Sequence, residues 1–287
     1  MGIRIEAFPR ERRHTLYFLD QARAFAPVFL DTEVDWSGIR RRRASGRGFS
    51  TVTHVLHAAA RVLAEHLEAN SAIARGLRPK VARYDSVNGK LTFDKVLNGR
   101  RVVLSTVLEG LQTASLEEIQ ERVEHFRDGD PAVMPEFARV RALHGLPRLA
   151  APVAYRAVSR SLRRRPQTMG TFAVTSLGHR PVDGFHSVGG TTITLGLGRV
   201  TDRPVVRGGR VEVAPVLRLN LAFDHRVIDG AEAADVLAEI KERLEADDGG
   251  AAEPTAAAEP TAAEESAGEG RANGTRPAEP RGTEEHR

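Results

Sequence analysis

The chain has 287 residues, of which 41% are apolar and 28% charged, and it contains no cysteine. This composition excludes disulfides, thiolate catalysis and cysteine-based zinc sites, and it is typical of proteins from a reducing compartment. No apolar run reaches membrane-spanning length, and the first residues contain no signal-peptide core. We therefore expect a soluble, cytoplasmic protein with no membrane partner and no metal.

Residues 247–287 differ from the rest because they contain no Leu, Ile, Val, Phe, Tyr or Trp. Such a segment cannot bury enough apolar surface to offset the entropy of ordering, so we expect a folded domain at 1–246 and a disordered Ala/Glu/Pro/Gly-rich tail at 247–287. The tail holds ten acids and four arginines while the whole chain carries +4, so the domain carries +10. That positive charge favours binding to a polyanionic partner, such as nucleic acid, a membrane surface or a phosphate-bearing cofactor.

In chain order, the apolar spacing first predicts a helix over 12–25 and then a strand over 28–34. The clearest helical stripe begins after Ser50 or Thr51 and runs to Leu67. The histidines of that helix lie mostly off the stripe, so we expect them to be exposed or half-buried.

Asn-Gly pairs at 88–89 and 98–99 indicate hairpin turns, and the apolar run 101–108 predicts a buried strand. A capping box, Ser-Leu-Glu-Glu at 115–118, predicts the start of a helix that extends to about residue 126. Residues 128–168 have no clear pattern, although 153–162 is compatible with a helix.

The last hundred residues have the clearest pattern. Strands are predicted at 171–175, 191–197, 211–213 and 217–223, and a helix over 230–244 with Asp229 as its N-cap. Helices and strands alternate without a βαβ rhythm. The fold class is therefore α+β, with a mixed or antiparallel sheet.

The motif that indicates chemistry is Phe-Asp-His-Arg-Val-Ile-Asp-Gly at 223–230. Its histidine, His225, directly follows a predicted strand, which is a rigid mounting for a general base. The pattern His-x-x-x-Asp-Gly alone is weak, because it recurs at 179–184. The second copy lies between Gly and Pro residues with no apolar helix after it, so we interpret His179 as a loop histidine.

Taken with Gly-Thr-Phe-Ala-Val-Thr-Ser-Leu-Gly at 170–178, this motif resembles the catalytic domain of the dihydrolipoamide acyltransferases of 2-oxoacid dehydrogenase complexes. That family shares its fold with chloramphenicol acetyltransferase, and the resemblance extends over about residues 10–246. It implies a CoA-dependent acyltransferase in which His225 deprotonates the thiol of CoA or dihydrolipoamide. The thiolate attacks an acyl thioester, and a hydroxyl group stabilises the oxyanion.

In the family that hydroxyl usually belongs to Ser; the matching residue here is Thr175, with Ser176 beside it. The leading hypothesis expects one of these two hydroxyls to face His225. By the same resemblance, Asp229 has a structural role and pairs with Arg12 or Arg13. The resemblance also implies a homotrimer with each active channel at a subunit interface.

The sequence also departs from the family pattern. We find no lipoyl lysine and no room for a lipoyl domain before Arg12, so we expect a stand-alone enzyme that meets a lipoyl domain in trans or uses acyl-CoA with another acceptor. An Asn-Pro-Pro-like segment of the family is replaced by 188–192. Two alternatives stay open: a small-molecule acetyltransferase of the chloramphenicol type, and a catalytically silent trimeric scaffold. Nucleic-acid binding rests on charge alone, because aromatic residues make up only 5% and no binding motif is found.

Overall fold

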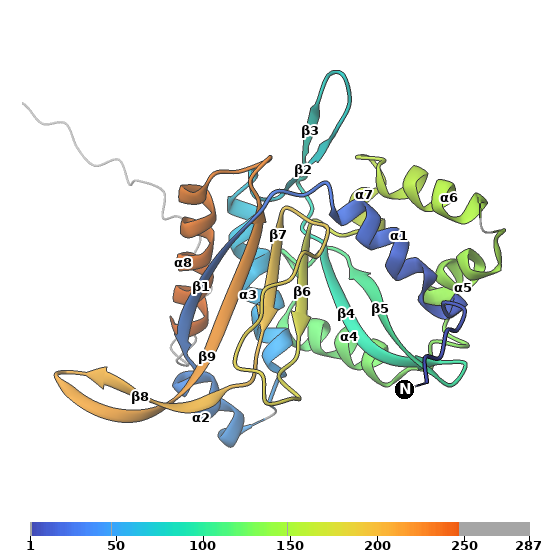
Figure 1. Ribbon diagram of the computed structural model, residues 1–287. Helices are drawn as coiled ribbons and strands as arrows, with labels where there is room; N and C mark the ends of the chain where they lie inside the picture. The colour runs from blue at the N-terminus through green and yellow to red at the C-terminus, as the bar shows by residue number, and fades with distance from the viewer. Residues whose placement is uncertain (1, 47, 148, 247–287) are drawn as a thin grey trace, which may run out of the picture. The chain divides into compact units, whose positions relative to one another are not determined.

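A computed structural model describes residues 2–246 apart from 47 and 148 (Figure 1). The tail predicted at 247–287 lies outside the described residues, so the domain boundary stays a prediction. No helix in the part of the chain that the structure describes is long and apolar enough to span a bilayer.

A seven-stranded sheet forms the centre of the fold in the order β1-β9-β7-β6-β4-β5, with β8 paired to β9 beside this path. Strand β6 runs parallel to β4 and β7, and the remaining pairs of this sheet are antiparallel. The mixed sheet flanked by helices confirms the predicted α+β class. The strands are β1 (Pro27–Asp35), β4 (Gly89–Leu97), β5 (Arg100–Leu108), β6 (Phe172–Ser176), β7 (Ile193–Leu197), β8 (Thr201–Arg207) and β9 (Arg210–Asp224).

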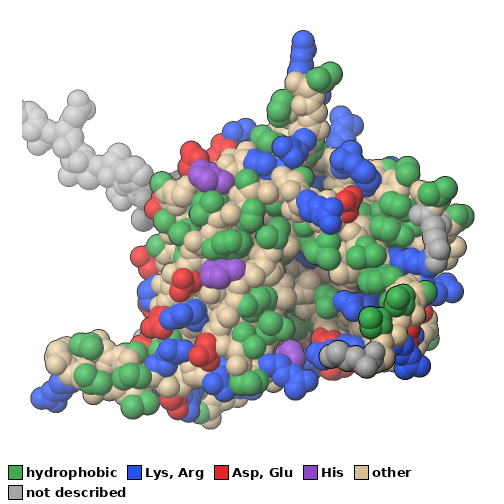
Figure 2. All heavy atoms as spheres, in the orientation of Figure 1, with side chains coloured by type: hydrophobic (Ala, Val, Ile, Leu, Met, Phe, Trp, Pro, Cys, Tyr) green, Lys and Arg blue, Asp and Glu red, His purple; other side chains and the backbone are tan. Residues whose placement is uncertain are grey.

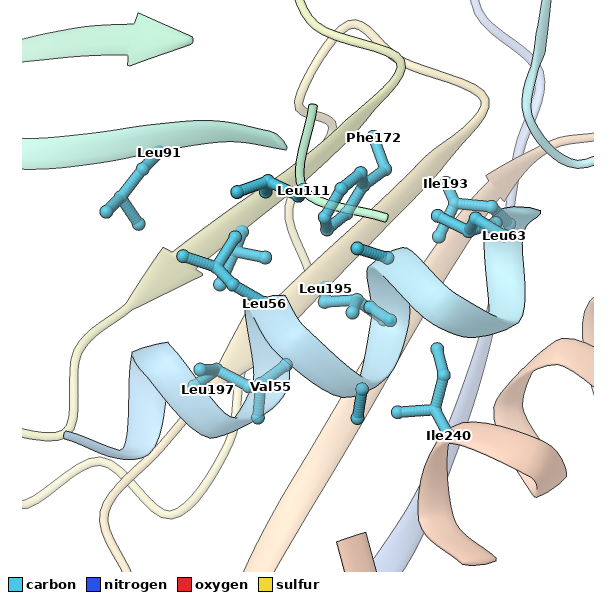
Figure 3. Close-up of a cluster of buried hydrophobic side chains, with 14 of the residues drawn as sticks. Val55, Leu56, Leu63, Leu91, Leu111, Phe172, Ile193, Leu195, Leu197 and Ile240 are labelled. Atoms are coloured by element: carbon cyan, nitrogen blue, oxygen red, sulfur yellow. The ribbon is translucent and has the colours of Figure 1, made fainter. Parts of the chain in front are cut away.

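One face of this sheet forms the core, because alternate side chains of each strand lie on the same side. The strand register aligns Leu91, Val174 and Leu195 in one row, and all three are buried. Helix α3 (Thr51–Glu65) lies across this face and α8 (Gly230–Ala246) packs against α3 and β1, as Figure 3 shows for side chains from both helices and the strands. The apolar stripe predicted for residues 52–67 is the core-facing side of α3 as far as Leu63, whereas Leu67 lies beyond the helix and is 44% exposed.

The other elements surround this core (Figure 1). A separate two-stranded hairpin, β2 (Ser71–Ala74) with β3 (Lys80–Arg83), projects from one end of the fold. Residues 128–168, which had no clear sequence pattern, form several short helices, two of which contact α1. The remaining helices are η1 (Arg10–Arg12), α1 (Arg13–Ala22), α2 (Ser37–Ser45), α4 (Leu116–Asp128), η2 (Pro135–Phe137), α5 (Ala138–Gly145), α6 (Ala150–Ser159) and α7 (Arg165–Thr168).

The opposite face of the sheet is covered by the long connection between β6 and β7. Its backbone lies directly on β7: a Cβ at Gly196 would stand 2.1 Å from the carbonyl oxygen of Phe185, and one at Gly198 would stand 2.1 Å from that of Asp183. Only glycine leaves room for this approach. The two glycines therefore determine the path of the connection that follows β6.

Both Asn-Gly pairs were predicted as turns, and one prediction is wrong. Asn98 and Gly99 form the β4–β5 turn with φ of 51° and 73°. Gly89, in contrast, begins β4, and the buried side chain of Asn88 donates to the Pro166 carbonyl at 3.1 Å. The Asn88 amide connects distant segments, which a local turn signal does not reveal.

Three other expectations need correction. The strand predicted as buried at 101–108 is the edge strand β5, in which Val103 is 55% exposed. The strands predicted separately at 211–213 and 217–223 are one continuous strand, β9, and its partner β8 was not predicted. His54, predicted at or near the surface, is only 6% exposed and packs between the rings of Trp36 and Phe49.

Candidate active site

His225 directly follows the last residue of β9, as the sequence predicted. Strands β1 and β7 flank β9, and the backbone at its end is fixed on both sides. The Asp224 N–H donates to the Thr192 carbonyl at 3.0 Å, and the His225 N–H donates to the Ala26 carbonyl at 2.9 Å. A tight turn closed by Val227 N–H to Asp224 C=O at 2.9 Å then leads into α8.

The His225 ring is oriented by the carbonyl of Ile228, which lies 3.1 Å from Nδ1. A carbonyl only accepts, so this contact requires the proton on Nδ1 and leaves the lone pair on Nε2. The side chain is 47% exposed, so Nε2 is accessible. This is the tautomer that a general base needs.

Asp224 and Arg226, on either side of His225, form a buried ion pair. Arg226 donates to the Asp224 carboxylate through Nε at 2.8 Å and also through Nη2. Asp224 is 2% exposed, and its Oδ1 also accepts from the Ala26 N–H at 3.4 Å. Arg226 stacks over Phe25 at 4.8 Å. The first and third residues of the Asp-His-Arg motif therefore hold the turn on which the histidine stands, a role the sequence analysis did not assign.

The pairing expected between Asp229 and Arg12 or Arg13 is not met within one chain. Asp229 is 90% exposed, and its Oδ1 lies 3.4 Å from His225 Nδ1. Arg12 stacks on Phe8 and lines a distant cleft, and within residues 2–246 as described neither arginine forms an ion pair with Asp229. Asp229 adds negative charge near Nδ1, which favours the same tautomer.

Thr175 and Ser176 end β6 and line a cleft of about 780 Å³ together with side chains of β4, β5, α1 and α4. The Thr175 hydroxyl accepts a hydrogen bond from the Thr92 hydroxyl at 2.9 Å. Ser176 Oγ accepts from the Gly178 N–H at 3.3 Å, within its own turn. Each hydroxyl thus accepts one bond and keeps its own proton for a further partner in the cleft.

A single chain does not bring Thr175 to His225. The register pairs Thr175 with Gly196 and Gly196 with Asn220, so His225 is two strands away and five residues further along β9. This amounts to about 17 Å along the strand and about 10 Å across it. The expectation that Thr175 or Ser176 faces His225 is not met within one chain.

A second, smaller cleft of about 230 Å³ lies beside the His225 turn, between α1, the end of β2 and α6. Its lining includes Asp224 and Arg226, which pair with each other, and the arginines Arg75, Arg156 and Arg160. No ion pair joins these three arginines to an acid within the part of the chain that is described. Figure 2 shows Lys and Arg side chains gathered below the projecting hairpin.

The segment 188–192, where the sequence departs from the family pattern, is held by a buried lysine. Lys90 Nζ donates to the Gly189 carbonyl at 3.1 Å and lies 4.5 Å from the centre of the Phe18 ring. Burial, and secondarily the charge of Arg165, lower the pKa of Lys90 to about 8. Arg165 also donates to the Gly190 carbonyl. The side chains of Lys90 and Arg165 thus hold Gly189 and Gly190 in place. Thr192 follows these glycines, and its carbonyl accepts from the Asp224 N–H at the end of β9.

The second His-x-x-x-Asp-Gly copy does not reproduce this arrangement. Asp183 pairs with Arg199 at 3.3 Å and Arg203 at 3.0 Å, not with His179. His179 is an exposed loop residue, as predicted, and lines the cleft that contains Thr175.

With the geometry established, similarities to known proteins can be compared with it. Residues 141–249 match the family of 2-oxoacid dehydrogenase acyltransferases (catalytic domain). The chain is 52% identical over 50 residues, 17% of its length, to the dihydrolipoyllysine-residue acetyltransferase component of the pyruvate dehydrogenase complex of Bacillus subtilis. It is 42% identical over 83 residues, 26% of its length, to the mitochondrial succinyltransferase component of the 2-oxoglutarate dehydrogenase complex of Bos taurus. These stretches make up only 11% and 17% of the two relatives.

The fold is similar over a much longer range. The solved dihydrolipoamide acetyltransferase of Azotobacter vinelandii superimposes with a TM-score of 0.62 and 21% identity, over 84% of this chain and 92% of that one. The predicted fold and the resemblance to this family are confirmed, and the relatives are acyltransferases.

Proposed function

We propose that the protein is a CoA-dependent acyltransferase, on the basis of the match of residues 141–249 to the 2-oxoacid dehydrogenase acyltransferase family. It moves an acyl group between CoA and a dihydrolipoyl-type thiol. The observation that carries the proposal is the orientation of His225, whose Nε2 lone pair is free while Nδ1 donates to the Ile228 carbonyl. The Asp224–Arg226 pair keeps this ring on a rigid turn.

His225 removes the proton of the attacking thiol through Nε2 as the thiolate adds to the thioester carbonyl. When the tetrahedral intermediate collapses, the original C–S bond breaks and the departing thiolate takes this proton from Nε2. A general base in hydrogen-bond reach of the proton contributes about 10²–10⁴ in rate. The Thr175 hydroxyl donates to the oxyanion that develops on the thioester carbonyl, which is worth about 10²–10³. His225 and Thr175 of one chain lie far apart, so the pair that acts on one substrate comes from two copies. This supports the homotrimer that the family resemblance implies.

The arginine-lined cleft supports CoA as the acyl carrier. Arg75, Arg156 and Arg160 line it next to the Asp224–Arg226 pair, so phosphate groups bound there would lie near the His225 turn. Arginine is well suited to phosphates because its guanidinium donates to two oxygens at once. The acyl acceptor is the dihydrolipoyl group of a lipoyl domain.

The test is acyl transfer from acetyl-, propionyl-, isobutyryl- and succinyl-CoA to dihydrolipoamide. Formation of the new thioester is followed beside two variants, His225→Ala and Thr175→Val. We expect turnover with at least one donor and a decrease of at least about a hundredfold in kcat for each variant. His125→Ala is the matched control and should retain kcat, because it removes an exposed histidine that lines neither cleft.

A folded protein that transfers no acyl group from any donor would contradict the proposal. If it also failed to bind CoA in a titration, the silent scaffold would be favoured. If it turned over acyl-CoA only with a small non-thiol acceptor, the small-molecule acetyltransferase would be favoured instead.

A further inference from the structure

Two threonine hydroxyls meet on neighbouring parallel strands at the edge of the 780 Å³ cleft. Thr92 of β4 and Thr175 of β6 follow the paired residues Leu91 and Val174, and their Oγ1 atoms are 2.9 Å apart. Both side chains are half-buried. The sequence analysis gave Thr92 no role.

The direction of this bond decides whether Thr175 is free to act. A hydroxyl carries one proton and accepts through two lone pairs, so only one of the two threonines donates to the other. Thr92 donates and Thr175 accepts in the structure. In this direction the Thr175 proton is left for a third partner in the cleft. In the reverse direction the Thr175 hydroxyl would donate its proton to Thr92 and could not donate it to a third partner.

We infer that Thr92 is a positioning residue for the acyl-transfer reaction. Its hydroxyl donates to Thr175 Oγ1, fixes the direction of the Thr175 proton and strengthens the bond that Thr175 gives to the oxyanion. The inference rests on the proposed function, in which Thr175 is that donor. No proton leaves either hydroxyl and no bond to carbon is made or broken by them.

Two physical effects give the Thr92 hydroxyl this influence. Hydrogen bonds in a chain polarise one another, so a hydroxyl that accepts a bond becomes a better donor. Both residues are also β-branched and stiff at χ1, which keeps the two oxygens in place before substrate binds. An oxyanion donor that is oriented in advance costs no reorganisation during the reaction.

The chain offers a matched control in Ser105. This residue of β5 is the register partner of Thr92 on the side away from Thr175. Directly opposed residues of an antiparallel pair lie on the same face, so Ser105→Ala removes a hydroxyl from the same region of the sheet. Within the described residues, no hydrogen bond joins Ser105 to either threonine.

The experiment measures kcat and KM for both substrates in Thr92→Val, Thr92→Ser, Ser105→Ala, Thr175→Val and the Thr92→Val/Thr175→Val double variant. Valine matches the shape of threonine and suits a strand, so Tm should change little. We expect Thr92→Val to lower kcat about tenfold without changing KM, because one hydrogen bond of about 1.4 kcal/mol is removed from the transition state. Thr92→Ser should retain most of kcat, and Ser105→Ala all of it.

The double variant separates positioning from a general structural effect. Thr92 acts through Thr175, so adding Thr92→Val to Thr175→Val should cause no further decrease in kcat. A Thr92→Val variant with wild-type kcat, or an undiminished tenfold decrease in the Thr175→Val background, overturns the inference alone. If Thr175→Val itself leaves kcat unchanged, the oxyanion role of Thr175 in the proposed function fails and the inference fails with it.

Discussion

Single residues around His225 show what a local motif can and cannot predict. The position of His225 past a strand end followed from the sequence, because alternation up to Phe223 and the Asp-Gly start of the next helix are both local signals. Asp224 is part of the same motif, but the motif reveals neither its burial nor its pairing with Arg226. Thr92 gave no sequence signal at all, because its partner is 83 positions away. Pairings across a sheet depend on register, which single strands do not encode.

The Asp224–Arg226 pair should contribute to both stability and activity. Asp224→Asn removes the charge that Arg226 neutralises, and breaking a buried pair costs about 3 kcal/mol. We expect a lower free energy of unfolding in urea together with a lower kcat, because the His225 turn is no longer fixed.

Asp183→Asn is the control for this prediction. Asp183 likewise forms ion pairs, with Arg199 and Arg203, but its side chain is 49% exposed. Surface ion pairs of this kind contribute about 0–1 kcal/mol to the free energy of unfolding. Equal destabilisation by the two variants would show that the Asp224 pair has no special structural role.

The arginines of the small cleft should act on binding and leave the chemical step unchanged. Arg156→Gln with Arg160→Gln removes two donors to phosphate, so we expect KM for acyl-CoA to rise at least tenfold, with kcat retained and the effect reduced at high salt. Arg163→Gln with Arg164→Gln removes the same charge from exposed positions outside the cleft lining. An equal rise in KM in this control pair would mean that only net charge matters.

At the scale of elements, the long and strongly periodic segments were predicted well. The stripe of α3 and the capping box of α4 are local patterns, and the structure contains both. The elements that were missed depend on tertiary partners: β8 is defined by its pairing with β9, and α5 and α7 are short helices that pack on α1 or on α6. Helix α6 overlaps residues 153–162, the one part of this region that was compatible with a helix. Their sequences have weak internal patterns because contacts with other elements determine their structure.

One of these contacts should make stability depend on pH. His14 Nε2 lies 2.9 Å from the Val103 carbonyl and must donate to it, so Nδ1 accepts from His144 Nε2 at 2.9 Å. The pair joins α1 and α5. Burial lowers the pKa of both rings, that of His144 to about 4.

A histidine with a lowered pKa binds fewer protons when folded than when unfolded, so it destabilises the fold as pH falls from about 6.5 towards 4. His144 is buried and His14 is half-buried. Allowing for solvent screening of the His14 ring, we expect the free energy of unfolding to decrease by about 1 kcal/mol between pH 7 and pH 5. Urea unfolding at the two pH values measures this. The decrease should be smaller in His144→Gln, and an unchanged decrease in that variant would assign the pH dependence to other groups.

At the scale of the whole molecule, the distance between the site residues could not be predicted from the sequence. The motifs around Thr175 and His225 are both recognisable, yet the sheet register holds them far apart in one chain. The sequence suggests which residues act together, whereas in the proposed assembly the arrangement of copies decides where they meet.

A shared site can be tested by complementation. His225→Ala and Thr175→Val, each nearly inactive alone, are produced together with different affinity tags, and mixed assemblies are purified through both tags. A mixed trimer holds two copies of one variant and one of the other, so about one third of its sites combine an intact His225 with an intact Thr175 from a neighbour. We expect roughly that fraction of wild-type activity. Activity no higher than that of the separate variants would contradict a site formed by two copies.

The distance between His225 and Thr175 has a consequence for the concentration at which the protein works. If each functional pair requires two copies, an isolated chain has a base without an oxyanion donor at one end of its sheet and a donor without a base at the other. Specific activity must then fall on dilution below the dissociation constant of the assembly. The abundance of the protein would thereby switch its catalysis on and off without any effector.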